Sequence, residues 1–402
     1  MFGVRKFDIL IGNPPYGISI KGQLRKRIEI SLGKVPDFEI YYYFIERAKT
    51  LLHNETGLLS YIIPNTYLFN TFAASYRINI LNEWGIIEIL DCSGFPIFQS
   101  AVVRNTVNLW QKKTNTFVEY RNNRNVKKFN DFINKPKQRM ANCELVEFNQ
   151  NWGLAFYLES TVLNLLKKID NSTKQLSNYF PNVGQGLIAY DKYQGQSEET
   201  IKTRAYHYFD NSKVGLKPWL WGADVNKYTV NWNKQEYIDY CQGIANPRQP
   251  KYFLGKRLLI REITNPSIFA GYTEAELYND PSLLIILDNN KFPILLLLAI
   301  LNSKFASFYH FNHSPKATKG AFPKILIQDL NQFPLPNVQN VDVMPIIVLV
   351  HEILTAKSND INANITLIEH NIDILIYKLY QLNYEEAKII DPGMLSSEYA
   401  KH

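Results

Sequence analysis

Short apolar runs alternate with amphipathic stretches over the first 118 residues. The runs at residues 7–12, 57–64, 86–93 and 103–113 are bounded by turn residues, as is typical of buried strands. Residues 36–52 and 73–83 carry apolar side chains at helical spacing. Strands that alternate with helices predict an α/β sheet, with residues 7–12 as a central strand.

The pattern changes after residue 118. Residues 119–150 are basic, with seven Lys or Arg and one Asp between positions 121 and 139. They predict either a solvated linker or a nucleic-acid contact. Residues 151–337 hold many short strand candidates, aromatic residues and turn residues, which predict a second domain of the α+β class. Residues 338–402 contain amphipathic patterns at 341–357 and 364–382, which predict a C-terminal helical hairpin.

Amino-acid composition excludes only a few classes of protein. The chain has 402 residues, 46% hydrophobic and 20% charged, and its net charge of +7 permits a polyanionic partner. Its three Cys residues stand far apart without a CxxC pair, so we expect a reducing, cytoplasmic location and no bound metal. The longest apolar run, residues 293–301, is too short to span a bilayer and predicts a buried helix with no membrane contact.

The first apolar run ends in Asn13-Pro14-Pro15-Tyr16, a candidate for chemistry. Two prolines fix the backbone and remove two donors, so nearby carbonyl groups are free to accept hydrogen bonds. The Asn13 side chain adds an acceptor, and Tyr16 adds a flat face for stacking. Two acceptors held together can take both hydrogens of an amino group and aim its lone pair at a methylsulfonium, which fits methylation of an exocyclic amine on a planar ring. The alternative is a Pro-Pro turn that only ends a strand.

The segment "DILIGNPPYG" at residues 8–17 resembles the catalytic motif of the amino-group DNA methyltransferases. Most of the chain resembles the C-terminal part of the gamma-class N6-adenine DNA methyltransferases, as in type IIG restriction–modification enzymes. The catalytic half of that likeness rests on "PDFEIYYYFIERA", "GLLSYIIPNTYL" and "FQSAVVRNTVNLWQKK". Later segments resemble the target-recognition domain and closing helix of the same family: "NVGQGLIAYDKY", "KPWLWGADVNKY", "LLLLAILNSKFASFYH", "TKGAFPKILIQDLNQFPLP" and "IDILIYKLYQLNYEEAKII".

This resemblance implies a partial Rossmann-like methyltransferase sheet at residues 1–118, a target-recognition domain at 151–337 and C-terminal helices at 338–402. It implies a site-specific, adenine-specific DNA methyltransferase that moves a methyl group from S-adenosylmethionine to the N6 amino group of a flipped adenine. Asn13, Pro14, Pro15 and Tyr16 would be catalytic. Cofactor contacts would come from Asp37, Phe38 and Asn13.

Basic residues of the second domain are candidate contacts to double-stranded DNA, since cations in loops suit phosphates. These candidates are Arg248, Lys251, Lys256, Arg257, Arg261, Lys316, Lys319 and Lys324. A solvated basic face is the alternative interpretation. His310 and His313 have no third metal ligand at useful spacing, so we interpret them as surface or packing histidines.

The resemblance also shows what precedes the catalytic strand in the family, namely the strands that bind most of the cofactor. Only six residues precede Phe7 here, so we expect an incomplete cofactor site and an apolar, unpaired strand edge. A partner polypeptide or a missing N-terminal region would supply those strands, and a nuclease would belong to the same part. A split subunit, a truncated chain and an edge covered in another way are the open explanations.

Other functions remain open alternatives. The chain is also compatible with a non-catalytic DNA-binding specificity module that needs a partner chain. A protein-glutamine methyltransferase shares the Asn-Pro-Pro-Tyr motif, but the large basic second domain argues against it. "PDFEIY" at residues 36–41 resembles part of a nuclease site but lacks the required lysine, so we expect no DNA cleavage by this chain alone.

Overall fold

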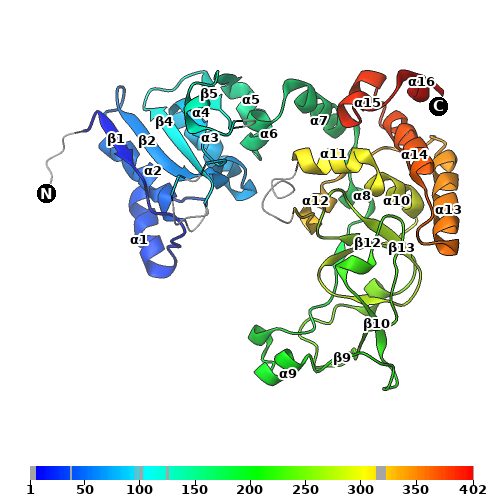
Figure 1. Ribbon diagram of the computed structural model, residues 1–402. Coiled ribbons are helices and arrows are strands. Elements are labelled where there is room, and N and C mark those ends of the chain that lie inside the picture. The colour runs from blue at the N-terminus through cyan, green and yellow to red at the C-terminus, as the bar shows by residue number, and fades with distance from the viewer. Residues whose placement is uncertain are drawn as a thin grey trace. The chain divides into compact units, whose positions relative to one another are not determined.

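The structure is a computed structural model and describes residues 6–36, 39–95, 97–98, 103–123, 126–313 and 323–401. The chain divides into two compact units, Met1–Glu159 and Ser160–His402 (Figure 1). The first unit is a mixed α/β sheet covered by helices. The second combines small sheets with helices, so the predicted fold class is confirmed.

The first unit is organised around a six-stranded sheet with the strand order β1-β2-β4-β3-β5-β6. Strands β1, β2, β3 and β5 run parallel to one another, and β4 and β6 run antiparallel to them. Strand β1 pairs only with β2 among the described strands, which agrees with the unpaired apolar edge expected for residues 7–12. The bounds are β1 (Ile9–Gly12), β2 (Leu58–Pro64), β3 (Gly85–Asp91), β4 (Asn105–Gln111), β5 (Phe117–Arg121) and β6 (Gln138–Ala141).

One face of this sheet is covered by helices. Tyr41, Ile45 and Ala48 stand at helical spacing on α2, which buries them in a core with Leu59 and Trp110 of the sheet. Side chains of α3, α5 and α6 complete the same core. The helices of the unit are α1 (Gly22–Leu32), α2 (Ile40–Leu51), α3 (Ala74–Glu83), α4 (Phe129–Ile133), α5 (Asn142–Glu147) and α6 (Trp152–Tyr157).

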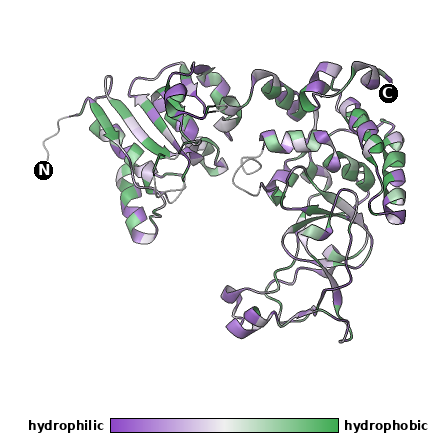
Figure 2. Ribbon diagram, viewed as in Figure 1, coloured by the Kyte–Doolittle hydropathy of each residue, from purple (hydrophilic) through white to green (hydrophobic). Residues whose placement is uncertain are grey.

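The other face of the sheet changes from apolar to charged across its width. Apart from Ser60 and Gln111, the paired positions on that face near β1 carry apolar side chains, which are Ile9, Ile11, Leu58, Ile62, Val107 and Leu109. Toward β5 and β6 the same face carries Glu88, which binds Arg121 at 2.9 Å and Lys137 at 2.8 Å. The apolar half therefore lies beside the unpaired edge of β1 (Figure 2).

The predicted basic linker at residues 119–150 is wrong for the described residues. This segment contains most of β5, the whole of β6 and the helices α4 and α5, all inside the first unit. Some of its cations have partners inside the unit, because Lys137 also binds Glu119 at 2.7 Å and Arg139 lies over the Phe117 ring at 3.2 Å. The boundary between the units falls at residue 159 instead.

The second unit contains two four-stranded sheets that share one core. Their strand orders are β14-β10-β11-β9 and β13-β12-β15-β8. Trp219 and Tyr278 of the first sheet and Leu259 and Ile285 of the second lie in that core. A further pair, β7 and β16, is antiparallel. The bounds are β7 (Lys174–Gln175), β8 (Gly184–Gln185), β9 (His207–Tyr208), β10 (Lys217–Leu220), β11 (Tyr237–Ile238), β12 (Arg257–Arg261), β13 (Ala270–Thr273), β14 (Tyr278–Asn279), β15 (Leu283–Leu287) and β16 (Pro334–Leu335).

The apolar run at 293–301 forms α10, which is buried along nearly its whole length, as predicted. Among the described residues, no single helix is long and apolar enough to cross a membrane; α10 and α11, bent by 66° at their break, pass that test only as a pair. The helices of the unit are α7 (Ser160–Ser172), α8 (Leu176–Tyr179), α9 (Glu198–Thr203), α10 (Ile294–Asn302), α11 (Lys304–His313), α12 (Ile327–Asn331), α13 (Met344–Asn359), α14 (Thr366–Leu379), α15 (Tyr384–Ile390) and α16 (Ser396–Lys401).

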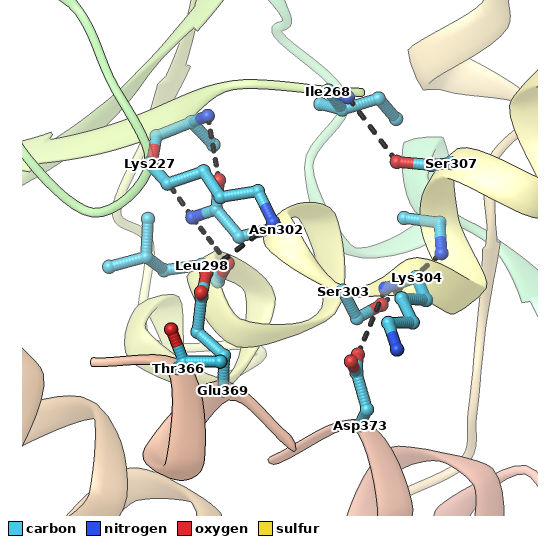
Figure 3. A network of polar contacts seen from close by, with 12 residues as sticks. Lys227, Ile268, Leu298, Asn302, Ser303, Lys304, Ser307, Thr366, Glu369 and Asp373 are labelled. Carbon is cyan, nitrogen blue, oxygen red and sulfur yellow. Dashed lines mark hydrogen bonds and ion pairs between the residues drawn. The ribbon is translucent and has the colours of Figure 1, made fainter. Parts of the chain in front are cut away.

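The predicted C-terminal hairpin is confirmed, since α13 and α14 pack against each other and α13 packs on α10. Polar contacts fix this layer to the sheets (Figure 3). The Asn302 amide exchanges hydrogen bonds of 3.0 and 2.9 Å with the backbone of Ala270. The Asp373 carboxylate of α14 accepts a hydrogen bond of 2.9 Å from the backbone N–H of Lys304, at the start of α11.

Candidate functional site

The Asn13–Tyr16 segment leaves the sheet at the carboxyl end of β1. Strands β1 and β2 are parallel and paired from Ile9–Leu58 to Gly12–Tyr61. A Cβ atom on Gly12 would lie 3.1 Å from the Tyr61 ring, so glycine lets this ring lie close to the start of the segment. Open α/β sheets bind their ligands at the carboxyl ends of parallel strands, which is where the segment lies.

The four residues of the segment differ in exposure. Pro14 is buried and Tyr16 is half-buried against the core of the first unit, whereas Asn13 and Pro15 are exposed. The Asn13 amide makes no hydrogen bond to any other described residue. The segment therefore combines a buried proline with an exposed amide and a partly uncovered aromatic ring.

The exit of the segment is fastened to the start of α2. Gly17 has a φ of +72°, and its backbone N–H donates a hydrogen bond of 2.9 Å to the Glu39 carboxylate. The backbone N–H of Ile40 donates to the Ile18 carbonyl at 3.2 Å. Glu39 also forms a β-bridge with Ser19. These contacts fix the path of the chain directly after the four residues.

Three buried polar residues lie along the same edge of the sheet, and the sequence analysis missed them. Asn65 follows β2, Asp91 ends β3 and Asn105 begins β4. One side-chain oxygen of each accepts no hydrogen bond in the described part of the chain. The available signal was their position, since each stands at the end of a predicted apolar strand.

The surroundings of the buried Asp91 carboxyl shift its pKa in opposite directions. Its burial raises the pKa of the carboxyl, an effect opposed by hydrogen bonding to Ser93, whose backbone N–H donates to it at 3.0 Å. Tyr120 and Tyr157 lie against the same carboxyl, and burial raises the pKa of both phenols. Buried, oxygen-rich groups therefore lie at the same edge of the sheet as the Asn13–Tyr16 segment.

The structure describes only some of the residues that were predicted to bind the cofactor. Asp37 and Phe38 lie outside the described residues. On the side away from β2, β1 has no described neighbour, and its Ile9 and Ile11 side chains are 55% and 81% exposed. The described residues therefore do not enclose an S-adenosylmethionine molecule by themselves.

The burial of Arg257 corrects its prediction as a DNA contact, whereas Arg261 is only half-buried. Arg257 is fully buried, and its guanidinium donates to the carbonyls of Gly255 (2.8 Å), Ala275 (2.8 Å) and Leu277 (3.2 Å). Arg261 donates to the Gly222 carbonyl at 2.7 Å and lies over the Phe269 ring. Burial lowers the pKa of both guanidinium groups. Arg257 therefore holds the fold of the second unit instead of facing a ligand, whereas the half-buried Arg261 stays a predicted contact.

Other predicted contacts stay accessible. Arg248, Lys251 and Lys256 are exposed, and the last two line an open groove of about 440 Å³ together with Asp288 and Asn290. Lys324 binds Glu262 at 3.0 Å, which offsets its charge. Lys316 and Lys319 lie outside the described residues. The structure thus brings Lys251 and Lys256 together and separates them from the buried Arg257.

The two candidate histidines pack inside the second unit. His310 is buried, and its burial lowers the pKa of the imidazole to about 4. The His313 ring stacks on Tyr309 with ring centres 4.9 Å apart. Among the described residues no group of three or more His, Cys, Asp or Glu side chains is arranged for a metal ion.

The fold and the site together define a methyltransferase-type sheet unit joined to a second unit of small sheets and helices. Residues 1–98 match the Eco57I restriction-modification methylase family, and residues 217–335 match the TaqI-like C-terminal specificity domain. The chain is therefore similar to restriction–modification methyltransferases in its first unit and to their specificity domains in its second.

Individual relatives agree with these matches. A protein of Methanocaldococcus jannaschii, predicted to be a type II restriction enzyme and methyltransferase, is 22% identical over 93% of this chain. The chain spans 31% of the length of that relative. The type II methyltransferase M.BanIII of Aneurinibacillus aneurinilyticus is 32% identical over 25% of this chain and 18% of its own length.

Solved structures agree with the fold. The type IIL restriction-modification enzyme MmeI, solved in complex with DNA, superposes with a TM-score of 0.58 at 12% identity. That likeness covers 98% of this chain and 57% of MmeI. The type ISP restriction-modification enzyme LlaGI, solved with a DNA substrate mimic, gives a TM-score of 0.50 at 13% identity, over 86% of this chain and 35% of LlaGI.

Proposed function

We propose that this chain forms the catalytic-motif and target-recognition part of a site-specific N6-adenine DNA methyltransferase in a type II restriction–modification system. The observation that carries the proposal is the exposed Asn13 amide beside the half-buried Tyr16 ring, at the carboxyl end of β1. The order of the two family matches, methylase first and specificity domain second, supports it.

The proposed site acts by orienting one amino group. The Asn13 side-chain carbonyl and the Pro14 backbone carbonyl each accept one hydrogen of the adenine N6 amino group, which draws its lone pair out of the ring system. Tyr16 stacks on the base after the base leaves the duplex. S-adenosylmethionine, when bound, supplies the methyl group as an electrophile on a sulfonium.

The remainder of the cofactor site comes, in this proposal, from another polypeptide segment. The unpaired edge of β1 offers free backbone donors and acceptors to a further strand. The apolar half of the outer sheet face, with Ile9 and Ile11 at its end, offers a surface to a covering helix. A preceding region or a partner chain fits both features, and a nuclease would belong to that part as well.

The test is methyl transfer by the enzyme that contains these strands, with Asn13→Ala as the variant. We expect the initial rate of methyl transfer to DNA to fall by about 10²- to 10³-fold, because one of two oriented acceptors is lost. DNA affinity should change less than about twofold, since Asn13 carries no charge. Asn130→Ala, at an exposed position of α4, is the matched control. Methyl transfer that survives the Asn13 change sinks the catalytic assignment.

Product analysis tests the base specificity. Digestion of the methylated DNA to nucleosides should yield N6-methyladenine and no N4-methylcytosine. The second product would move the proposal to another amino-group methyltransferase with the same site. This readout is independent of which residues bind the DNA.

A second candidate function is a DNA-binding specificity module without catalysis of its own. The observation that favours it is the open edge of β1, which leaves the cofactor unenclosed by the described residues. Calorimetric titration of S-adenosylmethionine into the purified chain separates the two. Micromolar binding favours an active methyltransferase, whereas no binding to a folded sample favours a module that needs a partner.

A further inference from the structure

Helix α1 lies directly after the proposed catalytic segment, with five residues between Tyr16 and its start at Gly22. It is unusual among the longer helices of the first unit because none of its eleven residues is buried. Residues 17–36, which contain it, hold five Lys or Arg and a single acid, Glu29. The sequence analysis assigned this segment no role.

The inner face of α1 is built to hold the helix in place. Ile28 and Leu32 pack against the core of the first unit. Arg25 binds Glu29 at 2.7 Å one helical turn away, and its guanidinium also donates to the Val35 carbonyl at 3.2 Å. Glu29, the one acid of the segment, therefore forms its ion pair on the inner face.

The outer face of α1 carries cations without acids. Gln23, Lys26, Arg27 and Ile30 stand at positions i, i+3, i+4 and i+7, which places them on one side of the helix. All four are exposed, and Ile30 is 87% exposed. Lys34, just beyond the helix, is exposed as well. This surface suits a ligand with regularly spaced negative charges and apolar sugar carbons between them.

We propose that the outer face of α1 binds the phosphate backbone of duplex DNA next to the nucleotide that enters the Asn13–Tyr16 site. The proposal rests on the proposed function and adds a contact surface in the catalytic unit. Six backbone steps join Tyr16 to Gly22, a reach of at most about 20 Å. Successive phosphates of one strand advance about 3.4 Å along the helix axis, so the contacts fall within roughly six nucleotides of the flipped base.

The experiment measures how DNA affinity depends on salt. Fluorescence anisotropy with a labelled random-sequence duplex gives the dissociation constant of the full chain between about 50 and 200 mM KCl. Loss of two phosphate contacts in Lys26→Gln/Arg27→Gln should lower the slope of log affinity against log salt by about 1.8. The salt concentration rises fourfold over this range. The factor by which affinity falls should therefore be about twelve times smaller in the variant than in the parent, because 4 raised to the power of about 1.8 is about 12.

A charge-matched control separates a local contact from net charge. Lys388→Gln/Lys401→Gln removes the same two charges from exposed positions on the C-terminal helices and should leave the slope at the parental value. Lys26→Glu/Arg27→Glu should lower the slope at least as much as the Gln pair. Thermal unfolding followed by circular dichroism should give the parental midpoint for all variants, since the changed side chains are exposed.

Each outcome decides the proposal. Equal slopes for the parent and Lys26→Gln/Arg27→Gln overturn it, and so does a chain that binds no duplex at the lowest salt. The Lys26→Gln/Arg27→Gln pair could instead change the association with the polypeptide that supplies the further strands and leave the salt slope unchanged. That result would show that protein, and not DNA, covers this face. If Asn13→Ala retains methyl transfer while Lys26→Gln/Arg27→Gln still lowers the salt slope, the DNA surface stands and the proposed catalysis fails.

Discussion

The backbone N–H of Gly17 donates a hydrogen bond of 2.9 Å to the Glu39 carboxylate, which ties the end of the Asn13–Tyr16 segment to the first turn of α2. Because Gly17 directly follows Tyr16, this contact holds the backbone in place at the end of the segment. The structure thereby links the proposed catalytic segment to a helix whose buried tyrosines lie in the core.

Loss of this contact should affect catalysis more than folding. Glu39→Ala removes the acceptor, and a charge-assisted hydrogen bond at a solvent-accessible site contributes about 1 kcal/mol, so methyl transfer should fall about fivefold. Glu39→Gln keeps an oxygen acceptor and serves as the control with a smaller loss. Initial rates of the assembled enzyme measure the effect. A fall in thermal midpoint that accounts for the whole loss of rate would contradict the positioning role.

Arg77 should be required for the stability of the first unit. Its buried guanidinium donates to the carbonyls of Tyr67 (2.7 Å), Asn70 (3.0 Å), Asn149 (2.7 Å) and Gln150 (2.8 Å), and burial lowers its pKa to about 10. Arg77→Ala leaves these acceptors without their donor, so we expect a loss of about 3 kcal/mol or more.

Hydrogen exchange of the backbone amides measures this effect locally. Exchange in α3 should become faster in Arg77→Ala, whereas exchange in α10 of the other unit should not change and serves as the internal reference. Arg77→Lys should retain part of the protection, because lysine keeps the charge but offers fewer donors in a different geometry. Unchanged protection of α3 in Arg77→Ala would show that these hydrogen bonds contribute little.

Lys256 and Arg257 are neighbours in the chain, but substitution of the first should weaken DNA binding and substitution of the second should lower stability. Lys256→Gln removes an exposed cation beside the groove and should lower the salt slope of DNA binding by about 1 without loss of stability. Arg257→Ala empties a buried position on the central strand pair of the second sheet and should destabilise the second unit by about 3 kcal/mol. Urea unfolding and anisotropy titrations compare the two. A lower salt slope in a well-folded Arg257 variant would contradict its internal role.

Local patterns in the sequence were sufficient for the elements around the proposed site. The runs that became β1, β2, β3 and β4 are short and apolar, and α2 shows its buried face through the spacing of Tyr41, Ile45 and Ala48. Helix α1 was not predicted, because a helix without buried residues gives no strong apolar period. The buried polar residues of the sheet edge were missed because their burial depends on which strands become neighbours.

The wrong predictions came from charges whose partners lie far away in the sequence. The basic stretch after residue 118 looked solvated, yet Arg121 and Lys137 reach Glu88 across the sheet. Arg257 looked like a phosphate contact, yet its acceptors are carbonyls 18 and 20 residues further along. A charged residue at the border of an apolar run has two interpretations, and only strand pairing decides between them.

The pH dependence of stability should carry a contribution from Asp373. Burial raises the pKa of this carboxyl to about 6 despite its hydrogen bond from Lys304, and the nearby Lys304 and Lys227 charges only partly oppose the shift (Figure 3). The ordinary value in an unfolded chain is about 3.9. Because the folded pKa is the higher one, the neutral carboxyl favours folding, and that contribution is complete below pH 4 and is lost as the pH rises through 6.

Asp373→Asn tests this directly, because an amide cannot ionise and its oxygen can still accept the hydrogen bond from Lys304. At pH 7 the variant should be more stable than the parent, by up to about 3 kcal/mol for a shift of two pKa units, and near pH 4 the difference should vanish. Urea unfolding at several pH values measures the difference. Asp360→Asn, at the exposed end of α13, removes one charge without this burial and is the control. A stability difference that is the same at pH 4 and pH 7 would mean that ionisation of Asp373 does not weaken the attachment of α14 to α11.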